Sequence, residues 1–255
     1  MPLGPDALPA QDKRRFARGF MPAVWLGLLV LAGWAMPLAE SLWQWVAPDA
    51  RQLVYQRATF FTLLGRHTLT VGLAAAITVS TGIAAGIAVT RAPGRDFMPL
   101  VAQLASLGQT FPPVAVLALA VPALGFGLLP IVVALSLYGL LPVVRNTIAG
   151  LQGVDAAAIT AARAMGMTAG QRLWRVELPL AAPIILAGVR TSITVNIATA
   201  ALGATVGASN LGDPIIAGIV NGNTAYVLQG ALMIALLALG VDSLLSVWQR
   251  HMWRT

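Results

Sequence analysis

The sequence has no cysteine, only two histidines and only nine acidic residues among its 255 residues. The lack of cysteine excludes disulfides, thiolate metal sites and cysteine nucleophiles. His67 and His251 lie far apart, and neither has a carboxylate at metal-ligand spacing, so we expect no metal and no cofactor. The one lysine, Lys13, lies outside any glycine-rich loop, so the chain cannot form a P-loop that needs a lysine. If ATP drives the activity, another subunit must hydrolyse it.

Charged residues of both signs are scarce as well. They make up 10% of the chain, whereas hydrophobic residues make up 58%, and this balance is far from that of a soluble domain. The net charge of +7 could indicate a nucleic-acid partner, but the basic residues are few and are spaced between long apolar runs. We therefore expect an integral membrane protein that lies in the lipid bilayer and binds no nucleic acid.

Long apolar segments predict an all-α membrane fold. A helix needs roughly 20 mostly apolar residues to cross a bilayer. About six segments meet this requirement, and an even number of crossings would place both ends of the chain on one side. The predicted spans are residues 21–39, 69–90, 97–121, 128–147, 180–206 and 226–248.

The basic residues are distributed unevenly between the predicted loops. They gather in the tail formed by residues 1–20, in the loops after the second and fourth spans, and at Arg250 and Arg254, whereas residues 207–225 contain none. Because cytoplasmic loops carry the excess of lysine and arginine, we expect both termini and these two loops in the cytoplasm.

The first predicted span has a second interpretation. A basic stretch, an apolar core and small residues around residues 38–41 also describe a cleavable signal peptide. Cleavage would leave five spans and an external N-terminus. We favour retention, because the apolar stretch is long for a signal core and the cleavage pattern is imperfect.

The segment from Gly150 to Pro179 is too polar to cross a membrane but is rich in helix-forming residues. Asp155 can cap a helix over residues 156–165, and Gly166 suits the left-handed position that ends it. A second helix is expected to begin at a capping box formed by Thr168 and Gln171. The segment therefore predicts a cytoplasmic loop of two short helices before the chain returns to the membrane at Pro179.

One face of the first loop helix is expected to contact a partner protein. Ile159, Ala162 and Gly166 follow a spacing of three and four residues, and Arg163 lies beside them. Such a knob of small residues can insert into a groove on a partner. The bland alternative is a plain amphipathic connector.

A longer pattern in this loop resembles a known family. Thr160-Ala161-Ala162 is followed after three residues by Gly166, and after nine more by Val176-Glu177-Leu178-Pro179. This is similar to the EAA loop of ABC importer permeases, in which Glu-Ala-Ala, three residues, Gly and nine residues precede Ile-x-Leu-Pro. In that family the loop is a coupling helix that docks into a cleft of the cytoplasmic ATPase. Here Thr160 replaces the glutamate, which removes a charge that could pair with the ATPase, and Val176 replaces the isoleucine.

The resemblance covers residues 63–250 and implies a five-helix type I permease core with the coupling loop at residues 151–179. Residues 21–62 would then be an extra span and an external connector. The resemblance also implies partners: cytoplasmic ABC ATPase subunits, a second permease copy or a similar permease, and an extracytoplasmic substrate-binding protein, all at the bacterial inner membrane. Residues 138–147, 188–191, 201–204 and 210–212 most resemble permeases for osmoprotectants such as glycine betaine, choline, carnitine or proline.

Polar residues and prolines within two spans indicate a candidate translocation path. Two adjacent prolines must kink the third span and free backbone carbonyls, and such a break commonly lines a cavity. The fifth span is polar along its length. Interhelical hydrogen bonding explains the same residues equally well. The candidate path residues are Gln109, Thr110, Pro112, Pro113, Asn196 and Thr199.

Two further features carry open alternatives. Arg190 lies within the fifth span, where a lone charge is costly unless it reaches the interface or pairs with a carboxylate. We expect no such carboxylate inside another span, because Asp96, Asp213 and Asp242 lie near predicted span ends. Residues 207–223 are expected to form an external cap with a short helix that Pro214 begins and Asp213 caps, either as a plug of the external mouth or as a connecting turn.

The alternatives to an osmoprotectant permease differ in energy source and chemistry. The chain could serve another small solute, such as an amino acid, or act as a gradient-driven carrier or channel. The scarcity of carboxylates inside the spans argues against a proton-driven carrier. A membrane enzyme is a third possibility, but no Ser-His-Asp, histidine-rich or paired-carboxylate arrangement emerges, so we expect no catalytic residue.

Overall fold

The computed structural model describes residues 9–252, and this part of the chain contains helices and no strand. Residues 1–8 of the expected tail and Arg254 lie outside the described residues. Helix α1 extends into the expected tail, because it begins at Pro9. The α-helices are α1 (Pro9–Ala35), α2 (Glu40–Val46), α3 (Phe60–Thr90), α4 (Met98–Thr110), α5 (Pro113–Leu124), α6 (Leu128–Gln152), α7 (Ala156–Ala164), α8 (Ala169–Arg172), α9 (Leu178–Thr199), α10 (Asp213–Asn221) and α11 (Thr224–Met252).

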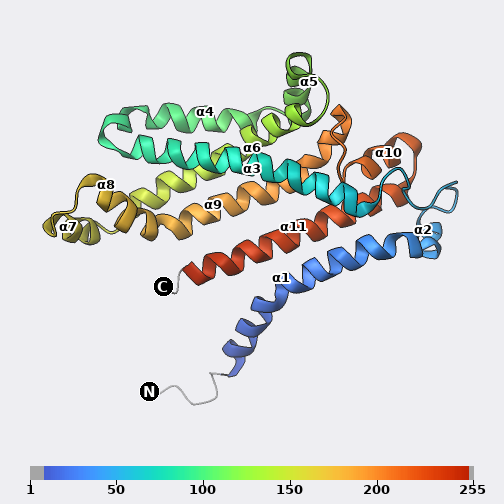
Figure 1. Cartoon of the computed structure of the whole chain (residues 1–255), viewed down its shortest axis with the longest axis horizontal. Coiled ribbons are helices and arrows are strands. Elements are labelled where there is room, and N and C mark those ends of the chain that lie inside the picture. Colours follow the sequence, from blue (N-terminus) through green and yellow to red (C-terminus); the bar gives the residue numbers. More distant parts are fainter. Residues whose placement is uncertain (1–8, 253–255) are drawn as a thin grey trace.

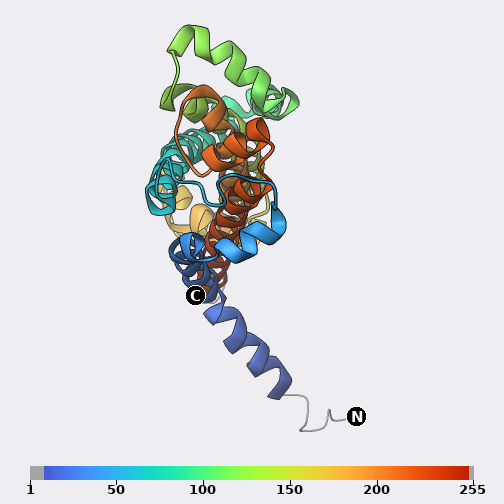
Figure 2. The ribbon, with the colours of Figure 1, turned by 90° about the vertical axis from the view of Figure 1, so that its right-hand side faces the viewer.

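The long helices lie alongside one another in an elongated bundle (Figure 1). Helices α7 and α8 lie at one end of the bundle, and α2, α10 and the loop before α3 lie at the other. The described beginning of α1 and the end of α11 both point toward the α7–α8 end. Figure 2 shows α4 and α5 at one edge of the bundle and α1 at the opposite edge.

Within residues 9–252, five helical segments are long and apolar enough to cross a membrane, and the bent pair of α4 and α5 qualifies as a sixth. Helix α3 has 31 residues. At 1.5 Å per residue it measures about 46 Å, which exceeds the hydrocarbon core of a bilayer at ~30 Å. The prediction of an all-α membrane protein with about six crossings is therefore confirmed.

The third predicted span, residues 97–121, is not one helix. A 3₁₀ turn (Ala92–Phe97) leads into α4, and α5 follows α4 at an angle of 95°. Phe111 and Pro112 have extended backbones because each precedes a proline, which disfavours the helical conformation. The predicted kink is confirmed, but it is a break of nearly a right angle rather than a bend within one straight crossing.

Close helix packing holds the α7–α8 half of the bundle together. A methyl group on Gly86 of α3 would lie 2.6 Å from Cβ of Thr147 on α6, and one on Gly188 of α9 would lie 2.5 Å from the Pro142 carbonyl oxygen on α6. Such small residues allow helix backbones to approach closely, which is a main source of helix association in membranes. Helices α3, α6 and α9 thus form a tightly packed unit with α6 in the middle.

Helix α1 packs along α11 at the edge of this unit. Leu26 of α1 occupies the space over Gly240, where an added methyl group would lie 2.8 Å from Leu26 Cδ2. Gly33 of α1 lies against Phe61 and Met233. The first predicted span is therefore integrated into the bundle, and its retention in the mature protein stays a prediction.

Candidate functional site

Helix α7 is capped at both ends by residues within the loop. Asp155 accepts a hydrogen bond from the backbone N–H of Ala157 at 2.9 Å. At the other end Gly166 has a φ of 76°, and its N–H donates to the carbonyl of Arg163 at 2.9 Å. The N–H of Met167 donates to the carbonyl of Ala162 at 3.1 Å, which completes a Schellman motif. The predicted caps of the first loop helix are confirmed.

The second half of the loop continues without a break into α9. Thr168 and Gln171 form the predicted capping box at the start of α8, with both reciprocal bonds present. After α8 the chain makes a π-turn (Leu173–Glu177), and α9 begins at Leu178. The π-turn was not predicted. Because α8, the π-turn and α9 follow one another directly, α8 is joined to α9 by continuous helical backbone.

The exposed face of α7 differs from the expected one. Ala162 is 1% exposed and Ile159 is half-buried, because α7 leans on α8 and the π-turn with this side. The expectation that Ala162 points toward a partner is therefore wrong for this conformation, whereas the docking role of the half-buried Ile159 stays a prediction. The outer face consists of small exposed residues that end in the 69% exposed Met165: Ala157, Thr160, Ala161 and Ala164.

The other residues proposed for docking surround this face. Arg163 and Gly166 are exposed, and no atom lies within 4 Å of the place where Gly166 would carry a Cβ. Thr160 donates its hydroxyl to the carbonyl of Ala156 at 2.8 Å, so its side chain is tied to its own helix. Leu178 is half-buried and Pro179 is exposed where the loop meets the membrane unit. The surface of α7 is thus small, uncharged and open to a partner, with Arg163 at its edge.

A buried ion-pair cluster lies at the base of the loop and was missed from the sequence. Glu177 is 4% exposed, and its Oε2 lies 2.6 Å from a guanidinium nitrogen of Arg91. Its Oε1 accepts a hydrogen bond from Nε of Arg172 at 2.8 Å. The available signal was that Glu177 is an acidic residue in a loop otherwise rich in arginine, which favours pairing.

The break between α4 and α5 is held against α6 by two hydrogen bonds. Pro142 has no N–H, so it leaves the carbonyl of Tyr138 without its donor in α6. Gln109 supplies the missing bond from α4, with Nε2 at 3.0 Å from that carbonyl oxygen. In return the Tyr138 hydroxyl donates to the carbonyl of Phe111 inside the break. The candidate path residues Gln109, Thr110 and Pro112 are exposed here, and Pro113 is half-buried.

The path candidates on α9 lie on the other side of α6. Asn196 is 0% exposed, and with Ser192 it packs against Gly139, the neighbour of Tyr138. Within the described residues its side-chain amide has no hydrogen-bond partner. Thr199 is half-buried and donates to the carbonyl of Val195 at 2.9 Å. The structure therefore brings Gln109 and Asn196 to opposite sides of one turn of α6 rather than to one cavity.

Arg190 has a carboxylate partner inside the bundle, contrary to expectation. Its Nε lies 2.6 Å and its terminal nitrogen 2.7 Å from the two oxygens of Asp242. Asp242 was assigned to a span end, but α11 runs on to Met252 and places it within the helix. The two side chains are 33% and 32% exposed. This bidentate pair joins α9 to α11 and removes the need for Arg190 to reach the interface alone.

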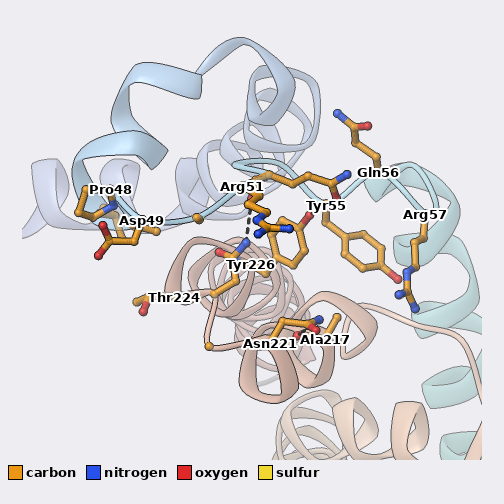
Figure 3. Close-up of a pocket in the computed structure, with 16 residues that line it drawn as sticks. Pro48, Asp49, Arg51, Tyr55, Gln56, Arg57, Ala217, Asn221, Thr224 and Tyr226 are labelled. Carbon is orange, nitrogen blue, oxygen red and sulfur yellow. Dashed lines mark hydrogen bonds between the residues drawn. The ribbon is translucent and has the colours of Figure 1, made fainter.

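A groove of about 1060 Å³ lies at the opposite end of the bundle (Figure 3). It separates residues 46–57, which belong to the connector, from the turn between α10 and α11. Gln229 of α11 holds the connector by accepting from the N–H of Tyr55 at 3.1 Å and donating to the carbonyl of Leu53 at 2.7 Å. Figure 3 shows Tyr55 close to Tyr226, with ring centroids 5.5 Å apart.

The segment of residues 207–223 contains the predicted short helix, α10, with one difference at its start. Asp213 is the first residue of α10 rather than its cap, and it accepts hydrogen bonds from the Ser209 hydroxyl and the Asn210 N–H. Gly222 ends the helix with a φ of 65°. Ile219 and Val220 are exposed, whereas Ile215 packs on the bundle.

Among the described residues no three histidines, aspartates or glutamates gather in a way that could hold a metal ion.

Proteins of known function resemble this chain over most of its length. It is 42% identical over 187 residues to the osmoprotectant import permease protein OsmY of Salmonella typhimurium. This alignment covers 73% of this chain and 79% of OsmY. It is 35% identical over 186 residues to the glycine betaine/carnitine/choline transport system permease protein OpuCB of Bacillus subtilis, with 73% and 85% covered.

Solved structures agree with the fold. A chain of the MetNI methionine ABC transporter in an inward-facing conformation superposes with a TM-score of 0.67 at 19% identity, over 76% of this chain and 95% of that one. The family described as the inner membrane component of binding-protein-dependent transport systems matches residues 78–254, which include α6, the capped loop of α7 and α8, and α9. This chain belongs to that family, the permease subunits of ABC importers.

Proposed function

We propose that this permease carries a small osmoprotectant, such as glycine betaine, choline, carnitine or proline, across the bacterial inner membrane. The substrate class rests on the relatives, whose names include osmoprotectants, choline, carnitine and glycine betaine. The import mechanism rests on one structural observation: α7 is capped at both ends and presents a face of small exposed residues, and α8, which follows it after a short turn, is continuous through the π-turn with α9.

The proposed complex has three kinds of partner. A second copy of this permease, or a similar permease, completes the pathway. Two cytoplasmic ABC ATPase subunits bind the pair, and the one below this chain docks on α7 through Thr160, Ala161 and the residues around Gly166. An extracytoplasmic binding protein delivers the substrate. The chain itself hydrolyses no ATP. In this arrangement both termini and the α7–α8 end face the cytoplasm, which agrees with the basic residues of this end.

The proposed domain division follows the same arrangement. Residues 21–62 form the extra span and the external connector, and residues 63–250 form the permease domain. Within it, the broken pair of α4 and α5 with Gln109, Thr110, Pro112 and Pro113 is the candidate translocation path, together with Thr199. Asn196, which is enclosed between α9 and α6 in this conformation, stays a proposed member of the path.

The first test is gentle detergent extraction from membranes in which all the proposed partners are expressed, followed by an ATPase assay. Recovery of an ATPase, and its loss when Ala161 is replaced by arginine, supports the docking surface. A matched control is the Ala92→Arg variant at an exposed position of the 3₁₀ turn after α3, which leaves α7 unchanged. Uptake of labelled betaine, choline and proline by the complex in vesicles then identifies the substrate. An ATPase-free permease that still transports would favour a gradient-driven carrier instead.

A further inference from the structure

The contacts around Glu177 connect the coupling loop to α3, a helix that is not continuous with the loop. Arg172 ends α8, and Glu177 ends the π-turn that leads into α9. Arg91 comes from elsewhere, because it is the residue directly after α3. Both carboxylate oxygens of Glu177 are used, one by each arginine. The carboxylate is therefore a joint between the loop and the end of α3.

Burial makes this joint strong. The side chain of Glu177 is 5% exposed, whereas those of Arg91 and Arg172 are 28% and 16% exposed. Water can reach the arginines but hardly the carboxylate. A buried carboxylate that loses an arginine has no solvent to replace it, so separating the pair costs more than it would at a surface. The end of α3 and the base of the loop are thus held together whenever Glu177 stays buried.

The ion pair gives the coupling loop a second connection to the packed unit of α3, α6 and α9. A displacement of α7 reaches α9 through the continuous backbone of α8 and the π-turn. Helix α3 has no backbone continuity with the loop. It meets the loop base through apolar packing, in which Ile83 and Ile87 share one cluster with Leu173, and through the ion pair of Arg91 with Glu177. Both α3 and α9 pack on α6 through glycines. With the ion pair present, motion of the loop is imposed on α9 and α3 together.

We propose that the ion pair of Arg91 and Glu177 makes α3 follow the coupling loop, so that the energy of ATP hydrolysis moves α3, α6 and α9 as one body. Arg91 and Glu177 are positioning residues in this role, since neither contacts substrate or nucleotide. The proposal rests on the proposed function, in which an ATPase moves the loop. It assigns to the loop base a function separate from docking.

The test is the Arg91→Ala variant in the complete complex, reconstituted in vesicles with ATPase and binding protein. This variant removes the ion pair with the end of α3 but leaves Glu177 paired with Arg172, so the buried carboxylate keeps one partner. We expect assembly and ATP hydrolysis to continue while substrate imported per ATP hydrolysed falls about tenfold, in the usual range of coupling between sites. The control is Arg95→Ala, which removes an exposed positive charge from the same turn and should leave the ratio unchanged.

Two further variants separate coupling from stability. Arg91→Lys retains a charge but not the guanidinium geometry, and it should give an intermediate ratio. Arg172→Ala keeps the link to α3 and should lower the ratio less than Arg91→Ala does. A normal ratio in Arg91→Ala would overturn the proposal. If no ATPase co-purifies with the wild-type permease, the proposed function is wrong. If the complex forms and Arg91→Ala imports as much substrate per ATP as the wild type, only the proposed role of the ion pair is wrong.

Because the chain has no cysteine, a covalent replacement of the ion pair can be tested cleanly. The double variant Arg91→Cys, Glu177→Cys should be uncoupled as purified. A bifunctional thiol reagent long enough to span the former ion pair should then restore import per ATP, since α3 is again tied to the loop. Loss of the remaining import on cross-linking would mean that the two segments must move apart, and this result would also overturn the proposal.

Discussion

Replacing Gly166 tests whether the end of α7 acts through its backbone or through the surface that it offers to a partner. The left-handed φ of 76° costs a residue with a Cβ about 1–2 kcal/mol. The Cβ itself meets no other segment, because no atom beyond the two chain neighbours lies within 4 Å of its position. The two γ-methyl groups of valine add local strain at a positive φ. Global stability of a folded protein is about 5–15 kcal/mol. A Gly166→Val variant should therefore remain folded in the membrane at nearly wild-type amounts.

The assay compares Gly166→Val with Gly166→Asn by uptake and by recovery of the ATPase. Asparagine tolerates the left-handed region, so it relieves most of the strain but keeps a side chain at the surface. If the end of α7 enters a close-fitting groove, both variants lose ATPase and uptake. A control is Gly222→Val, which meets a similar positive φ of 65° with open space at the opposite end and should retain the ATPase. Normal uptake by Gly166→Val would refute a docking role for this turn.

The remaining predictions concern polar contacts inside the bundle. Gln109→Leu should leave the carbonyl of Tyr138 unpaired and destabilise the chain by about 1–3 kcal/mol, seen as a lower Tm in detergent. The same change should cost much less in a Pro142→Ala background, because alanine returns the missing N–H to α6; equal losses in the two backgrounds would contradict the account of the break. Asp242→Ala should reduce the amount of permease in the membrane more than the double variant Arg190→Ala, Asp242→Ala, since the single variant leaves an unpaired charge within the bundle. Quantitative immunoblots of membranes would measure this, and a double variant worse than the single one would argue against pairing as the reason.

Local features of the loop were predictable because each depends on residues only a few positions apart. Asp155 caps Ala157, Gly166 closes the helix that ends beside it, and Thr168 pairs with Gln171. Apolar length likewise sufficed to place the spans. The orientation of α7 was not predictable, because almost every residue of the helix is small and hydrophobic spacing distinguishes its faces poorly. The contacts of α7 with α8 and the π-turn determine which face of α7 is buried.

The break between α4 and α5 was predictable in position but not in shape. Two consecutive prolines require an extended backbone before each, so a helix cannot pass through Phe111 and Pro112. They do not determine an angle. The angle depends on what receives the freed groups, and here a third proline, Pro142, exposes the carbonyl to which Gln109 binds. Prolines on two neighbouring helices therefore act together, which a search of each span by itself does not reveal.

The two missed ion pairs have one cause. Each joins residues on different helices, and whether two helices bring their charges to the same level depends on where the helices start and stop. Residues 226–248 placed Asp242 near a boundary, whereas the actual end at Met252 puts it beside Arg190. With nine acidic residues against sixteen basic ones, however, few pairings are possible in this chain. A charge that enters apolar surroundings needs a partner, so asking which arginine pairs with each acidic residue of the bundle would have restricted both Glu177 and Asp242 to a small number of choices.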